Sequence, residues 1–137
     1  MSLEDLSKKI GYEFEDIRLL DLALTHKSAD NNSNNERLEF LGDAILSTVV
    51  SEYLYIKFPN QKEGLLTRMR SHLVKGDTLT RLAYKLELIN FIKLSKGTAN
   101  LSNERKQSIL EGALEAIIGA VMLDSNWETS KRFVLQL

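Results

Sequence analysis

The stretch NERLEFLGD, residues 35–43, combines three acidic side chains with apolar residues at helical spacing. Glu36, Glu39 and Asp43 follow one another at intervals of three and four residues. On a helix that turns about 100° per residue, their side chains lie within an arc of roughly 60°. The residues between them are mostly apolar and include one glycine, Gly42. The stretch therefore predicts a helix with an acidic stripe beside an apolar one.

The acidic stripe has two interpretations. Carboxylates at neighbouring helical positions destabilise the helix and raise one another's pKa, so their charge has to be compensated. A solvated acidic face near a helix start is one interpretation, because the helix dipole favours negative charge there. A cation-binding site at the edge of the core is the other. Gly42 favours the second, because a glycine inside a helix costs about 1 kcal/mol relative to alanine and indicates a close approach.

The spacing outside this stretch predicts an all-α fold. Apolar residues mostly recur every three or four positions, and no segment is a convincing strand. The longest apolar band ends before Pro59, which disfavours helix in the preceding residue. The polar run 29–35 should form a loop whose side-chain oxygens cap the next helix. About seven helices are expected, at residues 3–10, 16–24, 36–57, 64–74, 78–86, 105–123 and 127–136.

The helix expected at residues 105–123 contains Glu115 in the middle of a strongly apolar run. Small residues at five of its positions allow close packing, so this helix should be buried on most sides. A carboxylate in such a place is costly without a partner. The partner is either an arginine or lysine at a packed edge, or a metal ion. Oxygen ligands and the absence of cysteine point to a hard cation such as Mg²⁺ or Mn²⁺.

Length and composition limit the class of protein. The 137 residues suit one domain, and the lack of cysteine excludes a disulfide framework, a thiol nucleophile and cysteine-ligated zinc. No apolar stretch approaches the roughly 20 residues of a membrane span, so we expect no membrane partner and a cytoplasmic location. The net charge of −1 gives no indication of a nucleic-acid partner.

Residues 35–46 closely resemble the signature of the ribonuclease III family, and the match continues in the family's order and spacing over most of the chain. The resemblance implies the all-α endonuclease-domain fold of that family over 1–137, without the double-stranded-RNA-binding domain that many members carry. It also implies a homodimer. The implied activity is hydrolysis of double-stranded RNA, such as precursors of ribosomal RNA, to 5′-phosphate and 3′-hydroxyl ends with two-nucleotide 3′ overhangs. The other matching segments are residues 23–28, 63–64, 68–70, 73–74, 108–110 and 115–120.

The resemblance also implies roles for particular residues. Glu39, Asp43 and Glu115 would bind Mg²⁺, which Mn²⁺ could replace, and the catalytic residues would be Asp43, Glu115 and Glu36. Phe40 matches an aromatic position that fills a pocket of the partner subunit. Packing in the chain's own core is the alternative for Phe40, whereas an exposed phenylalanine would need a partner surface to cover it.

A basic segment follows the central helix. Six lysines and arginines lie between residues 62 and 85 against two acidic residues, a local charge of +4. Arg68, His72 and Lys75 fall near one helical face and could contact RNA phosphates, with Glu63 as an acidic residue near the RNA. An ordinary solvated basic face is the alternative. Contacts with phosphates would be sensitive to salt and nearly independent of sequence, as recognition of A-form RNA requires.

The chain departs from the family pattern at residue 112, where Gly112 stands in place of an aspartate that would complete a four-carboxylate set. Glu111 is a possible substitute ligand, but its position is displaced by about 100° around the helix. The sequence therefore predicts an active ribonuclease III-type enzyme that lacks one expected metal ligand, a loss that could weaken its activity. The alternative is a catalytically impaired module that retains dimerisation or RNA binding.

Overall fold

The structure, a computed structural model, describes residues 1–75, 77–98 and 101–137. Within these residues the chain forms seven α-helices and two short 3₁₀ turns, and no strand. An isolated bridge pairs Thr25 with Lys93. The expected all-α fold is thus confirmed. The helices are α1 (Leu3–Ile10), α2 (Ile17–Ala23), α3 (Glu36–Lys57), α4 (Glu63–Val74), α5 (Asp77–Lys85), α6 (Asn103–Asp124) and α7 (Trp127–Gln136), with 3₁₀ turns at Leu88–Asn90 and Lys96–Thr98.

Capping side chains set several helix starts. The Ser2 hydroxyl accepts a hydrogen bond from the amide of Asp5, whose carboxylate accepts one from the amide of Ser2, a capping box that begins α1. Asp16 caps α2 rather than belonging to it. Ser102 caps α6, which therefore begins at Asn103, two residues before the expected start. Apolar periodicity predicted the starts of α2 and α6 only to within two residues, because capping residues lie outside the periodic pattern.

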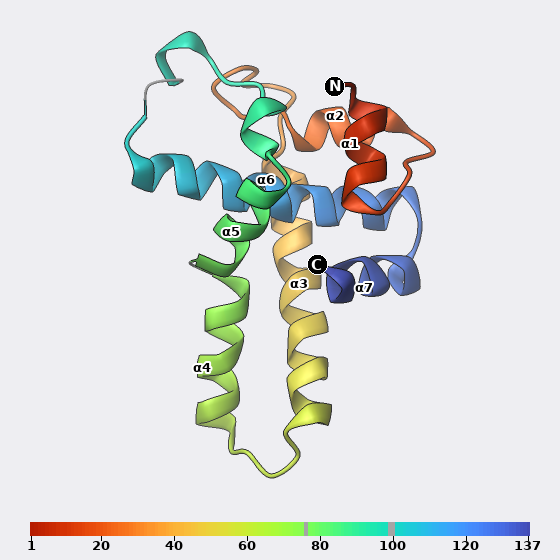
Figure 1. The fold of residues 1–137 in the computed structure, drawn as a ribbon, viewed down its shortest axis with the longest axis vertical. Coiled ribbons are helices and arrows are strands. Elements are labelled where there is room, and N and C mark those ends of the chain that lie inside the picture. Colours follow the sequence, from red (N-terminus) through yellow and green to blue (C-terminus); the bar gives the residue numbers. More distant parts are fainter. Residues whose placement is uncertain (76, 99–100) are drawn as a thin grey trace.

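Helices α3 and α6 form the centre of the molecule, and α3 continues beside α4 into a long two-helix arm (Figure 1). The two central helices cross with their backbones in contact. A Cβ at Gly42 would lie 1.6 Å from the carbonyl oxygen of Glu115, and one at Gly119 would lie 2.4 Å from the carbonyl oxygen of Leu38. The close approach predicted at Gly42 is therefore confirmed, and it brings the acidic stripe of α3 to α6.

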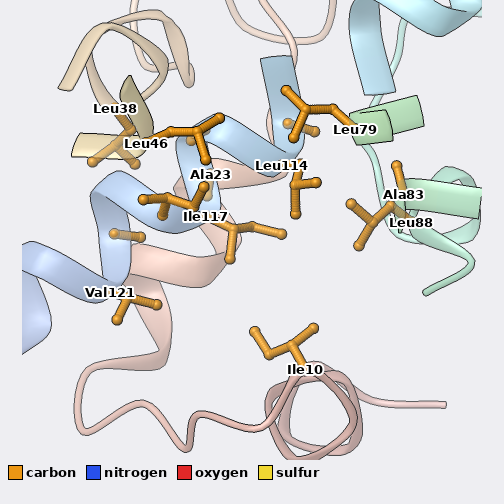
Figure 2. Packing of buried hydrophobic residues seen from close by; sticks show 14 of the residues in the cluster. Ile10, Ala23, Leu38, Leu46, Leu79, Ala83, Leu88, Leu114, Ile117 and Val121 are labelled. Carbon is orange, nitrogen blue, oxygen red and sulfur yellow. The ribbon is translucent and has the colours of Figure 1, made fainter. Parts of the chain in front are cut away.

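The hydrophobic core surrounds α6. Eight of its apolar residues have no exposed surface, as expected for a helix buried on most sides: Leu110, Ala113, Leu114, Ala116, Ile117, Ile118, Ala120 and Val121. Figure 2 shows side chains of the other helices gathered around Leu114 and Ile117. Such burial contributes about 1.5–3 kcal/mol for each large aliphatic side chain. The core thereby holds the middle of α6 rigidly against α3, at the level of Glu115.

The membrane prediction was tested on the same residues. Across 1–75, 77–98 and 101–137, no helix combines the length and the hydropathy that crossing a bilayer requires.

Candidate active site

The crossing of α3 and α6 brings three predicted carboxylates together. Glu39 and Asp43 lie one turn apart on α3, and Glu115 lies on the facing surface of α6. The carboxyl groups of Asp43 and Glu115 are close enough to share a hydrogen bond. Asp43 is exposed, whereas Glu39 and Glu115 are half-buried. The cluster therefore has one side in the core and one side open to solvent.

The electrostatics of this cluster favour protonation when no cation is present. Burial raises the pKa of Glu115 to about 9, and the hydrogen bond and charge of Asp43 add to this effect, followed by the charges of Glu39 and Glu111. Burial also raises the pKa of Glu39, together with the charges of Glu36 and Asp43. A cation would compensate the charge that these pKa shifts reflect.

A pocket of about 190 Å³ opens beside Glu39. Glu36 lies on this side of the site, where its charge acts on Glu39 and on His26 rather than on Glu115. Lys27 lowers the pKa of Glu39 and supplies a positive charge. The pocket is lined by His26, Lys27, Asn35, Glu36, Glu39, Ser108, Ile109 and Gly112. It is the solvent-accessible approach to the cluster from the Gly112 side.

Buried hydrogen bonds position the start of α3. The Asn35 side chain donates to the carbonyl oxygen of Ala23 at 3.0 Å, and its amide donates to the carbonyl oxygen of Thr25 at 2.9 Å. The expected capping by the polar run is only partly correct, because Asn34 accepts from the amide of Glu36, whereas Asn35 does not cap the helix with its side chain. Asn35 instead joins the acidic stripe to the end of α2.

His26 has a structural role at the edge of the pocket. Its Nδ1 accepts from the Ser28 amide at 3.1 Å and lies 2.8 Å from the Ser28 hydroxyl oxygen. That hydroxyl oxygen also accepts from the amide of Ser95. Burial lowers the pKa of His26, and Lys27 and Arg105 add to the effect, so the neutral ring is favoured with its proton on Nε2. His26 thus fixes one wall of the pocket.

The position of the missing ligand is occupied by another side chain. A Cβ added at Gly112 would lie 2.8 Å from Oε2 of Glu39 and 3.1 Å from Oε1. Glu111, the possible substitute, accepts a hydrogen bond from the hydroxyl of Thr80 on α5 at 3.0 Å. Its charge still contributes to the raised pKa of Glu115. The two candidates for the missing ligand therefore differ, since Glu39 lies over Gly112 and Glu111 is held towards α5.

The donor set fits a hard cation in its chemistry. Carboxylate oxygens are the ligands that Mg²⁺ and Mn²⁺ prefer. Burial, followed by the neighbouring carboxylates, raises the pKa of Glu115, and a bound cation would lower this pKa again. Within the part of the chain that the structure describes, no three or more histidine or acidic side chains lie in an arrangement that could hold a metal ion as it stands. Glu39, Asp43 and Glu115 would therefore have to adjust their carboxyl groups around a cation.

The predicted RNA-binding residues lie on and beside α4, in the two-helix arm. Arg68 and His72 are exposed on this helix, and Glu63 accepts a hydrogen bond from Thr67 of the next turn. Lys75 lies one residue beyond the helix end, with extended backbone angles, so its predicted place on the helical face is wrong. No described hydrogen bond or ion pair joins these residues to the carboxylates. The structure therefore brings the acidic cluster together but keeps the basic residues apart from it.

Phe40 is 80% exposed on α3, next to Glu39. The alternative that Phe40 packs in the chain's own core is therefore wrong. Exposed side chains of this size are unfavourable unless another surface covers them.

Sequence reasoning singled out Glu36, Glu39 and Gly112 in the lining of the pocket, but not Lys27 or Ser108. Lys27 and Ser108 belong to segments that match the family pattern, but neither has a chemistry that marks it as part of a site. Thr80, which holds Glu111, gives no sequence signal because its contact spans 31 residues. The family match was the only signal that could have drawn attention to Lys27 and Ser108.

Comparisons with known proteins agree with the family resemblance of the sequence. The model of the Ribonuclease-III-like family matches residues 16–137. A ribonuclease 3 from Shewanella amazonensis is 51% identical over 134 residues, which are 98% of this chain and 59% of that protein. A ribonuclease 3 from Vibrio cholerae is 48% identical with the same coverage. The chain thus spans less than two thirds of the length of these relatives.

Solved structures give the same result. A nuclease domain of ribonuclease III from Campylobacter jejuni superposes with a TM-score of 0.93. That structure is described as showing structural flexibility in a region involved in dimer formation. It is 46% identical, and the match covers 98% of this chain and 94% of that domain. A Dicer from Pichia stipitis superposes with a TM-score of 0.69 at 28% identity, over 89% of this chain and 53% of the Dicer chain. This chain belongs to the ribonuclease-III-like family.

Proposed function

We propose that this chain is the catalytic domain of an endoribonuclease that hydrolyses double-stranded RNA with Mg²⁺, which Mn²⁺ can replace. The observation that carries the proposal is the meeting of Glu39, Asp43 and Glu115 at the α3–α6 crossing, where burial and mutual charge raise the pKa of Glu115 to about 9. Nuclease domains of the same family share the fold. A cytoplasmic location and precursors of ribosomal RNA as substrates are part of the proposal.

The proposed chemistry is hydrolysis by an activated water molecule. A bound Mg²⁺ would lower the pKa of its water and stabilise negative charge on the phosphate. Glu39, Asp43 and Glu115 would hold the ion through carboxylate oxygens once Glu115 has lost its proton. Glu36 lines the neighbouring pocket with an exposed carboxylate that can orient the attacking water. The products would carry 5′-phosphate and 3′-hydroxyl ends with two-nucleotide 3′ overhangs.

RNA binding is proposed for the arm. Arg68, His72 and Lys75 are exposed there and can contact phosphates, with Glu63 near the RNA. We propose a homodimer that covers Phe40 and sets two sites along one duplex, supported by the dimer-forming region described for the related Campylobacter jejuni domain. Both features suit recognition of the shape of A-form RNA rather than its sequence.

Cleavage of a long RNA duplex tests the proposal. With Mg²⁺, the chain should cut the duplex and leave single-stranded RNA of the same sequence intact. Asp43→Asn should lower the rate more than about 100-fold. Changing a residue that only hydrogen-bonds to a metal ligand typically costs about 10–100-fold, and losing the ligand itself should cost more. A folded chain that leaves the duplex uncut at every Mg²⁺ and Mn²⁺ concentration would contradict the proposal.

Gly112 favours a second candidate function, a dimerisation or RNA-binding module that has lost cleavage. This candidate predicts duplex binding without metal-dependent cutting, and an Asp43→Asn variant that behaves like the wild type. Recovery of cutting in Gly112→Asp would then identify the missing ligand as the cause.

A further inference from the structure

The absence of a side chain at residue 112 has a consequence for the opposite helix. Gly112 is buried on α6, and all three heavy atoms nearest to an added Cβ belong to the carboxyl group of Glu39, at 2.8–3.1 Å. Contacts below 3.0 Å are essentially absent between real Cβ atoms and their neighbours. The carboxyl group of Glu39 therefore occupies space that any other residue at position 112 would fill.

The neighbouring acidic residue does not use this space. The carboxylate of Glu111 is bonded to the Thr80 hydroxyl at 3.0 Å, which directs it towards α5. Glu39 instead lines the pocket next to Gly112, together with Lys27 and Ser108. Of the two carboxylates, Glu39 is thus the one whose place depends on Gly112.

We propose that Gly112 is a working part of the site, because it leaves room for the Glu39 carboxyl group to take the place of the α6 aspartate in holding a divalent cation. The site is then a rearranged three-carboxylate site rather than a four-carboxylate site with one ligand lost. This inference rests on the proposed metal-dependent function. It makes position 112 sensitive to size, independently of charge.

Mn²⁺ binding by the purified chain, measured by calorimetry without RNA, tests this proposal. Gly112→Ala adds one methyl group and no ligand, and we expect it to weaken Mn²⁺ binding about tenfold, as changes that reorient a ligand do. The melting temperature without metal should stay the same or rise, because the displaced atoms end a flexible side chain and alanine favours helix. A weaker site in an equally stable protein separates the proposal from a folding defect.

The controls use the same substitution and the same ligand. Gly64 lies in α4 with nothing within 4 Å of an added Cβ, so Gly64→Ala should bind Mn²⁺ like the wild type. In a Glu39→Gln background, Gly112→Ala should cause no further loss, because the group that it displaces no longer binds the ion. If Gly112→Ala weakens Mn²⁺ binding as much in the Glu39→Gln background as in the wild type, the proposal is overturned.

The remaining outcomes separate the inference from the proposed function. If the wild type binds Mn²⁺ and Gly112→Ala binds it equally well, the inference is wrong and the nuclease proposal is unaffected. If the wild type binds no Mn²⁺ at millimolar concentration, both are wrong.

Discussion

Glu115 is the residue whose protonation should control the stability of the metal-free chain. Its pKa is raised from 4.5 to about 9 by burial and by Asp43, so between these values the native state holds a proton that the unfolded chain has released. The contribution of this proton to stability is therefore fully present below about pH 4.5 and is lost as the pH rises towards 9. In Glu115→Gln this decrease should largely disappear, leaving the variant about 1–2 kcal/mol more stable than wild type at pH 9 after allowance for solvent screening.

Urea unfolding in EDTA at several pH values measures this difference. Glu13→Gln makes the same change at an exposed loop residue and is the matched control. Its free energy of unfolding should equal that of the wild type at every pH. Parallel pH profiles for wild type and Glu115→Gln would contradict the raised pKa.

At the same scale, the sequence predicted the acidic residues but not their arrangement. Helical spacing was sufficient to place Glu39 and Asp43 on one stripe. The apolar run around Glu115 indicated that its carboxylate would be buried and would need a partner. The contact between Glu39 and the space at Gly112 depends on how two helices cross, which no local pattern contains. The hydrogen bond between Glu111 and Thr80 was hidden for the same reason.

The crossing of α3 and α6 is the element on which the site depends. A Cβ at Gly42 would overlap the Glu115 carbonyl oxygen at 1.6 Å, and backbone cannot rotate away as a side chain can. We expect Gly42→Ala to lower the free energy of unfolding by about 3 kcal/mol or more, at the upper end of overpacking effects. Urea denaturation followed by circular dichroism measures the loss, with Gly64→Ala as the control. An unfolding midpoint equal to that of the control would show that the helices do not touch.

Helix positions were predictable because their apolar faces repeat with the helical period. The starts of α2 and α6 were not, since Asp16 and Ser102 act through capping hydrogen bonds outside that period. Lys75 was placed on a helical face by extrapolating the same period past the true end of α4. Periodicity predicts which residues face the core, whereas polar contacts decide where each helix stops.

For the whole molecule, the exposure of Phe40 leads to a prediction about assembly. An 80% exposed phenylalanine contributes little to the stability of one subunit but, at the centre of an interface, can contribute about 2 kcal/mol or more to association. Phe40→Ala should thus weaken the homodimer at least about 30-fold and leave the urea midpoint of the monomer almost unchanged. Analytical ultracentrifugation measures the dissociation constant. Leu123→Ala, at another exposed site on α6, is the control, and equal dissociation constants for the two variants would argue against Phe40 as an interface residue.

The architecture of the whole chain was predictable from two sources of different kinds. Apolar periodicity indicated an all-α fold, but the way the helices pack came from the resemblance of residues 35–46 and later motifs to a known family. Overall composition gave no indication of RNA, since the net charge is −1 and a net positive charge was found only locally, at residues 62–85.

The chemistry of the RNA ends produced by the chain tests the central claim most directly. A duplex labelled at either end should be cut only with Mg²⁺ or Mn²⁺, and its products should carry 5′-phosphate and 3′-hydroxyl groups with two-nucleotide 3′ overhangs. Those ends require attack by water on the phosphate. Products with 2′,3′-cyclic phosphates, or no metal-dependent products from a folded dimer, would contradict hydrolysis at the Glu39, Asp43 and Glu115 site.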